Sequence, residues 1–124
     1  MHIAYLVITI LFSAMVAFSA AVKVRRDPKV VHVIHEVVGI PLQYFPALAA
    51  CELAGSLGLI LGIWLPSVAL AAAVGLVIYF VGAVVSHVRV GDINGIGPAV
   101  FMLLVAAAAL ALHVLTHTPD YISL

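Results

Sequence analysis

Long apolar runs separated by short polar connections dominate the amino-acid sequence. Four runs are long enough to cross the hydrocarbon core of a bilayer, which is about 30 Å thick and takes roughly 20 helical residues. They cover residues 3–22, 46–65, 67–86 and 96–115. Open sheets cannot span lipid, and the sequence has no alternating pattern of the length that a barrel strand needs. The pattern therefore predicts an all-α integral membrane four-helix bundle, which forms a single membrane domain over residues 1–124.

The connection between the first two runs carries a weaker helical pattern over residues 28–38. Asp27 is suited to cap a helix that begins with Pro28, and Gly39 is suited to end it. Apolar residues recur there at helical spacing opposite polar ones: Val31, Ile34 and Val38 against Lys29, His32 and Glu36. We predict a short amphipathic helix that lies in the membrane interface.

The composition agrees with a membrane protein and excludes several other classes. Of the 124 residues, 66% are apolar and 8% are charged, whereas soluble domains have about 45–50% and about 25%. A chain of this length cannot bury so much apolar surface in a soluble core. This excludes a water-soluble enzyme, a nucleic-acid-binding protein and a disordered chain, and the zero net charge indicates no acidic partner. The single cysteine, Cys51, allows no internal disulfide and no cysteine-based zinc site, and we expect it to be a small buried apolar residue.

The basic residues are confined to one side of the predicted membrane. All five follow the first or the third run: Lys23, Arg25, Arg26, Lys29 and Arg89. Basic short loops stay in the cytoplasm, so both termini are expected outside. No basic residue precedes the first run, as one would in a signal peptide, so this run is expected to remain as a transmembrane helix. Interfacial aromatic side chains are expected for Tyr5, Trp64 and Tyr121 at the outer side and for Tyr44 at the inner side.

Glu52 is the one acid inside a predicted span. It follows Pro46 by six residues, which places it about 9 Å along the helix at 1.5 Å per residue. An intramembrane acid normally faces the bundle interior and marks a ligand, proton or cation site. The alternative is a buried acid that only holds helices together. If Glu52 is charged, then Lys23, Arg89 or a protonated His87 must compensate it.

Other polar residues fall at a similar depth. His87, Arg89 and Asp92 close the third span, where His87 can exchange a proton near neutral pH and Arg89 can pair with Asp92 or hold an anionic head group. Tyr79 lies deeper on the same span. We therefore predict a ligand-binding or proton site formed by six residues: Lys23, Glu52, Tyr79, His87, Arg89 and Asp92. The alternative for the end of the third span is a basic anchor with a solvated histidine.

The remaining histidines favour no metal site. His32, His35 and Glu36 have spacings that can share part of a helix face, and first-row metals accept such ligands. Because the sequence supplies no second cluster of ligands, a solvated interfacial face is the preferred interpretation. His113 and His117, one turn apart at the outer end, are expected to be interfacial.

Small residues recur along the second and third spans. Gly58 and Gly62 form a GxxxG pattern that Ala54 extends, and such patterns let helices approach closely. We expect packing within the bundle, with contact between subunits as the alternative. Gly75 and Gly82 make a similar strip on the third span.

The order and spacing of several short motifs resemble the DoxX-like family of small four-helix bacterial membrane proteins. The motifs are Phe18-Ser19-Ala20 with Lys23, Val38-Gly39-Ile40-Pro41, Glu52-Leu53-Ala54-Gly55, Gly62-Ile63-Trp64-Leu65-Pro66 and Gly82-Ala83-Val84-Val85-Ser86-His87-Val88-Arg89-Val90-Gly91-Asp92. The founding relatives look like membrane subunits of a thiosulfate:quinone oxidoreductase, and others are linked to redox-defence assemblies. The resemblance therefore implies an accessory or quinone- or lipid-binding subunit in the bacterial cytoplasmic membrane, with a protein partner or a homo-oligomer.

Two other functions remain open at the level of sequence. One is a small proton-coupled transporter, although the acid lies in the second span and the strong basic bias fixes a single orientation. The other is a purely structural membrane protein whose acid orders packing. The sequence carries no flavin, haem or iron–sulfur motif. We therefore expect no intrinsic cofactor; a bound quinone is what the family resemblance implies, and any electron transfer would need a partner or such a quinone.

Overall fold

The computed structural model describes residues 2–37, 39–93 and 96–122, without the side chains of residues 2, 30, 33, 35, 37 and 118–122. The long helices are α1 (His2–Val24), α3 (Phe45–Leu61), α4 (Pro66–Arg89) and α5 (Ile96–Ile122). All four are long and apolar enough to span a membrane, which confirms the predicted helical bundle. Short helices link α1 to α3: α2 (Pro28–Val31), the π-helix η1 (His32–Val37) and the 3-10 helix η2 (Leu42–Tyr44).

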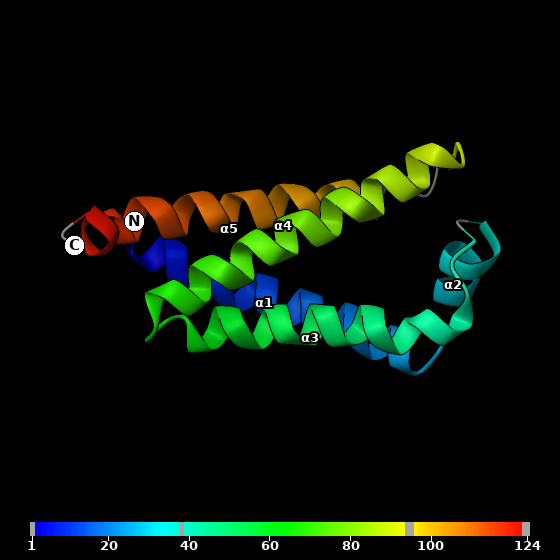
Figure 1. Cartoon of the computed structure of the whole chain (residues 1–124), viewed down its shortest axis with the longest axis horizontal. Helices are drawn as coiled ribbons and strands as arrows, with labels where there is room; N and C mark the ends of the chain where they lie inside the picture. The colour runs from blue at the N-terminus through cyan, green and yellow to red at the C-terminus, as the bar shows by residue number, and fades with distance from the viewer. Residues whose placement is uncertain (1, 38, 94–95, 123–124) are drawn as a thin grey trace.

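The four long helices form a ring in which each contacts two neighbours. Helices α1 and α4 each pack against both α3 and α5. Figure 1 shows both termini at one end of the bundle and α2 at the other. We call the end with residues 23–44 and 87–93 the basic end, because it holds every Lys and Arg of the chain, and the opposite end the terminal end.

Local signals in the sequence set several helix ends. The side chain of Asp27 accepts a hydrogen bond from the Lys29 N–H at 3.0 Å, and Pro28 opens α2, as predicted. Gly39 has a φ of +89°, a conformation that suits glycine and ends the helical stretch. The expected amphipathic helix is therefore present, but its second half winds as a π-helix.

Two helix boundaries differ from the expectation. Helix α3 ends at Leu61 and not at residue 65, because Gly62 caps it and residues 62–64 form a turn. Helix α5 continues to Ile122, beyond the expected end at residue 115. Apolar runs mark only the part of a helix that can lie in hydrocarbon, so a helix that extends into the interface is underestimated.

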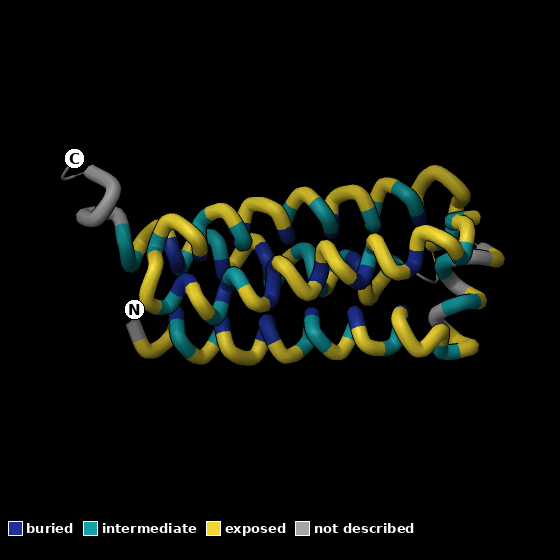
Figure 2. Tube along the Cα trace, turned by 60° about the horizontal axis from the view of Figure 1, so that its bottom comes forward, coloured by how far each residue is buried: buried dark blue, intermediate teal, exposed yellow. Residues whose placement is uncertain are grey.

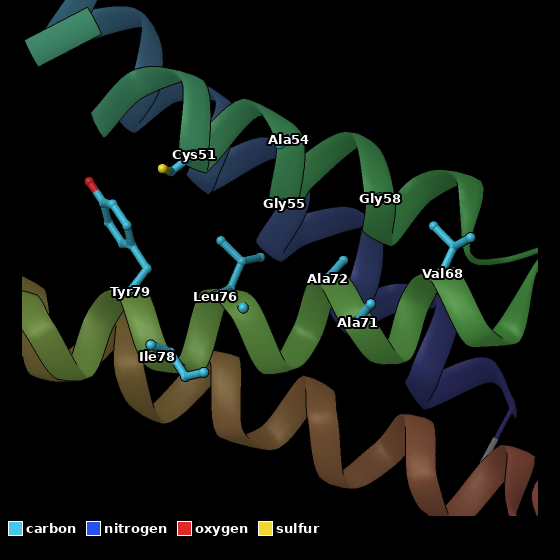
Figure 3. Close-up of a pocket in the computed structure, with 11 residues that line it drawn as sticks. Cys51, Ala54, Gly55, Gly58, Val68, Ala71, Ala72, Leu76, Ile78 and Tyr79 are labelled. Carbon is cyan, nitrogen blue, oxygen red and sulfur yellow. The ribbon is translucent and has the colours of Figure 1, made fainter. Parts of the chain in front are cut away.

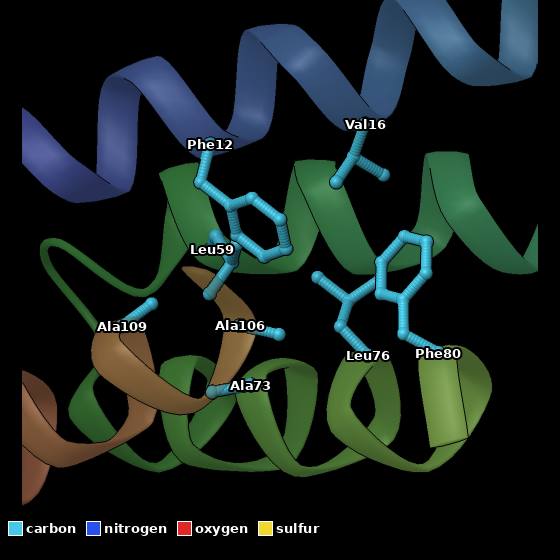
Figure 4. Packing of buried hydrophobic residues seen from close by; sticks show 8 residues of the cluster. All are labelled: Phe12, Val16, Leu59, Ala73, Leu76, Phe80, Ala106 and Ala109. Atoms are coloured by element: carbon cyan, nitrogen blue, oxygen red, sulfur yellow. The ribbon is translucent and has the colours of Figure 1, made fainter. Parts of the chain in front are cut away.

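An apolar cluster fills the middle of the bundle. It contains Phe12, Val16, Leu59, Ala73, Leu76, Phe80, Ala106 and Ala109, which come from all four long helices (Figure 4). Figure 2 shows that buried residues recur along the helices, with intermediate and exposed residues between them. That exposed surface is also apolar, for example at Leu57, Ile78 and Leu104. This arrangement is expected where hydrocarbon surrounds the bundle.

The glycine pattern of α3 packs inside the molecule. A Cβ atom at Gly58 would lie 2.8 Å from the Ala72 Cβ, and one at Gly62 would meet the side chain and backbone of Ala69. The expected packing within the bundle is therefore confirmed, with α4 as the neighbouring helix. Gly75 and Gly82 do not serve such an approach, because a Cβ at either position meets nothing within 4 Å.

Candidate ligand-binding site

An ion pair between Lys23 and Glu52 forms the centre of the candidate site. The Lys23 ammonium nitrogen lies 2.8 Å from Oε1 of Glu52. It also donates a hydrogen bond of 2.8 Å to the hydroxyl of Ser19, one turn earlier on α1. Glu52 is fully buried and Lys23 is 8% exposed, so both charges lie where water cannot screen them. Of the three cations considered for Glu52, Lys23 is therefore the one in contact.

The chain topology brings these two residues together. Helix α1 runs towards the basic end and finishes just after Lys23, while α3 starts at that end and reaches Glu52 after two turns. Because α1 and α3 are packed side by side, the last turn of one lies against the first turns of the other. The long lysine stem can then carry its charge to the carboxylate.

Tyr79 approaches the same carboxylate from α4. Tyr79 lies near enough to Glu52 for the two side chains to interact electrostatically. Despite the ion pair with Lys23, neither Glu52 oxygen has a well-formed hydrogen bond within the part of the chain described. Buried polar atoms are usually satisfied by a protein group, water or ligand. The carboxylate thus retains capacity for one further partner.

A second polar pair closes the basic end of α4. Nδ1 of His87 lies 2.8 Å from Oδ2 of Asp92, and both side chains are largely buried. The helix terminus itself creates this pair. Gly91 has a φ of +71°, its N–H bonds to the Val88 carbonyl, and the Asp92 N–H bonds to the His87 carbonyl. This Schellman motif folds Asp92 back over the last turn, towards the histidine.

Arg89 takes no part in that pair. Asp92 contacts His87, so the suggested pairing of Asp92 with Arg89 is not the arrangement in the structure. Arg89 is exposed at the end of α4, in a position suited to an anionic head group.

A cavity of about 600 Å³ connects these groups. Its polar lining comprises Ser19, Lys23, Lys29, Tyr79, Ser86 and His87. Its apolar lining includes Val22, Leu48, Phe80, Ala83, Ala99 and Met102, and Ile34 and Ile40 of the interfacial segment cover it. The volume lies within the range of typical small-molecule sites, which are mostly apolar with a few placed polar groups.

The structure thus gathers most of the predicted site residues in one region. Lys23, Glu52 and Tyr79 interact directly, and His87 lines the same cavity with Asp92 beside it. Sequence reasoning missed Ser19 and Lys29. The spacing of Ser19 and Lys23, four residues apart on one helix, is a signal that could have found the former.

The facing of three residues could not be predicted from the sequence, and for one of them the expectation was wrong. Tyr5 and His113, expected at the depth of the membrane interface, point into the bundle and are 2% and 1% exposed. The His113 ring stacks on His117 with centroids 4.6 Å apart, and Tyr5 packs against both rings. Cys51, expected to be buried, is exposed on α3. In a bilayer both the core and the outer surface are apolar, so residue type does not decide which way a side chain faces.

The histidines of the interfacial segment form no metal cluster among the described residues. No three His, Cys, Asp or Glu side chains of that set converge. His32 and Glu36 lie 2.7 Å apart and are both exposed, in agreement with a solvated face. The side chain of His35 lies outside the described part of the structure.

Comparison with known proteins gives one finding. No curated protein and no solved structure matches the chain. A family model does match, that of the DoxX-like family, over residues 7–111. This range includes α3 and α4, the larger part of α1 and α5, and every candidate residue of the site. The chain therefore belongs to the DoxX-like family of membrane proteins.

Proposed function

We propose that this protein binds a quinone- or lipid-like amphiphile in the cavity at its basic end and acts as an accessory membrane subunit of a redox-associated assembly. The observation that carries the proposal is the cavity of about 600 Å³, which combines an apolar wall with three functional side chains: Lys23, Tyr79 and His87. A ligand that is dissolved in the bilayer and carries a polar head group matches such a lining.

The polar groups suit a head that carries oxygen atoms. The Lys23 ammonium and the Tyr79 phenol are hydrogen-bond donors on the cavity wall, and a carbonyl oxygen accepts such bonds. The Glu52 carboxylate pairs with the lysine from behind the cavity wall. Oxidised and reduced quinones present carbonyl and hydroxyl groups respectively. Lys23 and Tyr79 can donate to the carbonyl groups, and the hydroxyl oxygen of Ser86, which also lines the cavity, can accept from the hydroxyl groups.

His87 supports proton exchange at the same site. Asp92 holds its Nδ1, which leaves Nε2 as the second ring nitrogen for the cavity or for water. Reduction of a quinone consumes two protons for each two electrons. The chain's own residues supply donors and a titratable imidazole, while the electrons come from a partner protein in this proposal.

Binding to purified protein in nanodiscs tests the proposal. We expect decylubiquinone to bind the wild type and to bind Tyr79→Phe and Lys23→Met about tenfold more weakly, since each loses a hydrogen bond to the ligand. His87→Ala is expected to lose less, because solvent replaces a side chain nearer the surface. Val81→Ala, on the exposed face of α4 and outside the cavity, serves as the control and should bind as the wild type does.

Two results would contradict the proposal. One is the absence of binding to the wild type. The other is equal affinity for the wild type and Tyr79→Phe, provided that this variant has wild-type thermal stability. Cross-linking in native membranes followed by identification of linked proteins tests the assembly: recovery of an oxidoreductase supports an accessory role, and capture of this chain alone opposes it.

A further inference from the structure

A second cavity opens on the outer surface of the bundle, between α3 and α4. It measures about 590 Å³, and its wall is almost wholly apolar. We call it the lateral groove. Its lining includes Cys51, Ala54, Gly58, Ala71, Gly75 and Tyr79. It lies along the transmembrane part of both helices, so hydrocarbon chains of the bilayer reach it directly.

The groove exists because α3 carries small residues. Close approach at Gly58 and Gly62 holds α3 against α4 towards the terminal end. Towards the basic end the two helices carry Cys51, Ala54 and Gly75, which are exposed and too small to fill the space between them. Figure 3 shows Tyr79 at that end of the groove, where its phenol points from α4 towards α3 beside Cys51.

Tyr79 separates this groove from the polar cavity. Among the described residues that line either space, Tyr79 alone lines both. Its phenol interacts with Glu52, whereas its ring lies against groove residues of α3 and α4. A molecule that reaches Tyr79 from the lipid therefore contacts a residue that also lines the cavity of Lys23 and His87.

We propose that the lateral groove is the binding site for the apolar chain of a single-chain amphiphile, whose polar head passes Tyr79 into the cavity that holds Lys23 and His87. This inference rests on the proposed function. It adds where the apolar chain of the ligand binds and how its polar head enters the cavity. The groove matches a chain in position, polarity and volume, because it is continuous with the bilayer, lacks polar atoms along its length and ends at a hydrogen-bonding residue. A prenyl chain of a quinone and an acyl chain of a fatty acid share this chemistry.

A variant that fills the groove tests the proposal with two matched probes. Gly75→Phe places a ring in the groove, and the helix tolerates it because a Cβ there meets nothing within 4 Å. Val81→Phe puts the same ring on the exposed face of α4 outside both cavities. The probes are duroquinone, which has no chain, and decylubiquinone, which has one.

We expect Gly75→Phe to weaken decylubiquinone binding about tenfold, the loss of roughly two buried methylene groups. Duroquinone should bind this variant as it binds the wild type, and Val81→Phe should change neither affinity. If the affinity of Gly75→Phe for decylubiquinone is unchanged, the lateral groove is not the binding site of the chain, and the proposed function stays intact. An equal loss for both probes also overturns it, because the effect then does not concern the chain. If the wild type binds neither probe, the proposed function fails, and this inference fails with it.

Cys51 offers an independent measurement without substitution. It is the only cysteine of the chain and lines the groove. A bimane fluorophore on Cys51 should be quenched by decylubiquinone at lower concentration than by duroquinone; equal quenching opposes the proposal. Palmitate, added to the labelled protein in the presence of decylubiquinone, distinguishes the source of the chain. If palmitate relieves the quenching by decylubiquinone, the groove binds acyl as well as prenyl chains. If it does not, the groove binds the quinone chain.

Discussion

At position 52 a carboxylate lies fully inside the bundle, and its charge is compensated by Lys23 at 2.8 Å. Removing both charges from water costs several kcal/mol per ion, and their attraction offsets this only when the geometry is good. The pair is therefore poor evidence for stability by itself. In the proposed function the pair contributes to binding, because Lys23 lines the cavity and the hydrogen bonding of Glu52 is incomplete.

Variants that neutralise first Glu52 and then both Glu52 and Lys23 separate a role of the ion pair in binding from a role in helix packing. We expect Glu52→Gln to lower the free energy of unfolding by about 3 kcal/mol, because Lys23 is left as an uncompensated buried cation. The double variant Lys23→Met/Glu52→Gln should recover at least half of this loss, while decylubiquinone binding stays about tenfold weaker than in the wild type because the Lys23 donor is absent. Denaturant unfolding and decylubiquinone titration of the same nanodisc samples measure both quantities.

Recovery of stability together with recovery of binding would show that the pair only orders the helices. That outcome would favour the alternative of a purely structural membrane protein whose acid orders packing. Ser56→Ala, a buried substitution on the same helix, controls for nonspecific effects on α3.

At the scale of elements, the ends and contacts of the helices place the site. The glycine turn after α4 folds Asp92 over His87, and the aspartate cap at residue 27 starts the interfacial segment that covers the cavity. The small residues of α3 bring it close to α4 at the terminal end. Helix contact in a membrane depends on such close packing, because lipid is as apolar as the side chains.

Two glycines on facing helices should respond to alanine in opposite ways. Gly62→Ala adds a Cβ that meets the backbone of Ala69, so we expect a loss of about 1–3 kcal/mol. Gly75→Ala adds a Cβ that meets nothing and raises helix propensity, so we expect no loss and a gain of up to about 1 kcal/mol. Thermal unfolding in one detergent measures both; equal effects would contradict the packing of α3 on α4.

At the scale of the whole molecule, the buried ionisable side chains gather towards the two ends of the ring of helices. Lys23, Glu52 and His87 lie towards the basic end, and Tyr5 and His113 lie towards the terminal end. The apolar cluster of the core lies between them (Figure 4). This arrangement suits a protein that binds a ligand near one end and whose interior is filled by packed side chains along the rest of the bundle.

The distribution of charge predicts the orientation of the bundle. Every Lys and Arg lies at the basic end, so we expect that end in the cytoplasm. In a Cys51→Ala background, an impermeant maleimide on intact cells should label Ser67→Cys and not Gln43→Cys, both of which are exposed positions. Lysed cells provide the control, in which both should react. Labelling of residue 43 in intact cells would reverse the orientation.

The sequence by itself determined the four spans, the interfacial segment and the family, because each depends on local information. Apolar runs mark what can lie in hydrocarbon, Asp27 and Gly39 mark ends, and the acid at Glu52 marks the interior of the bundle. Only the tertiary structure decided which cation meets that acid, because Lys23 reaches it from a different helix.

The facing of individual residues also needed the tertiary structure. Cys51 faces outwards, contrary to the expectation, and His113 points into the bundle, which the sequence pattern did not indicate. In water, an apolar residue faces the core and a polar one faces solvent, so helical periodicity reveals orientation. In a bilayer, apolar residues satisfy both faces of a helix, so its rotation is set by how small and large side chains interlock with neighbouring helices.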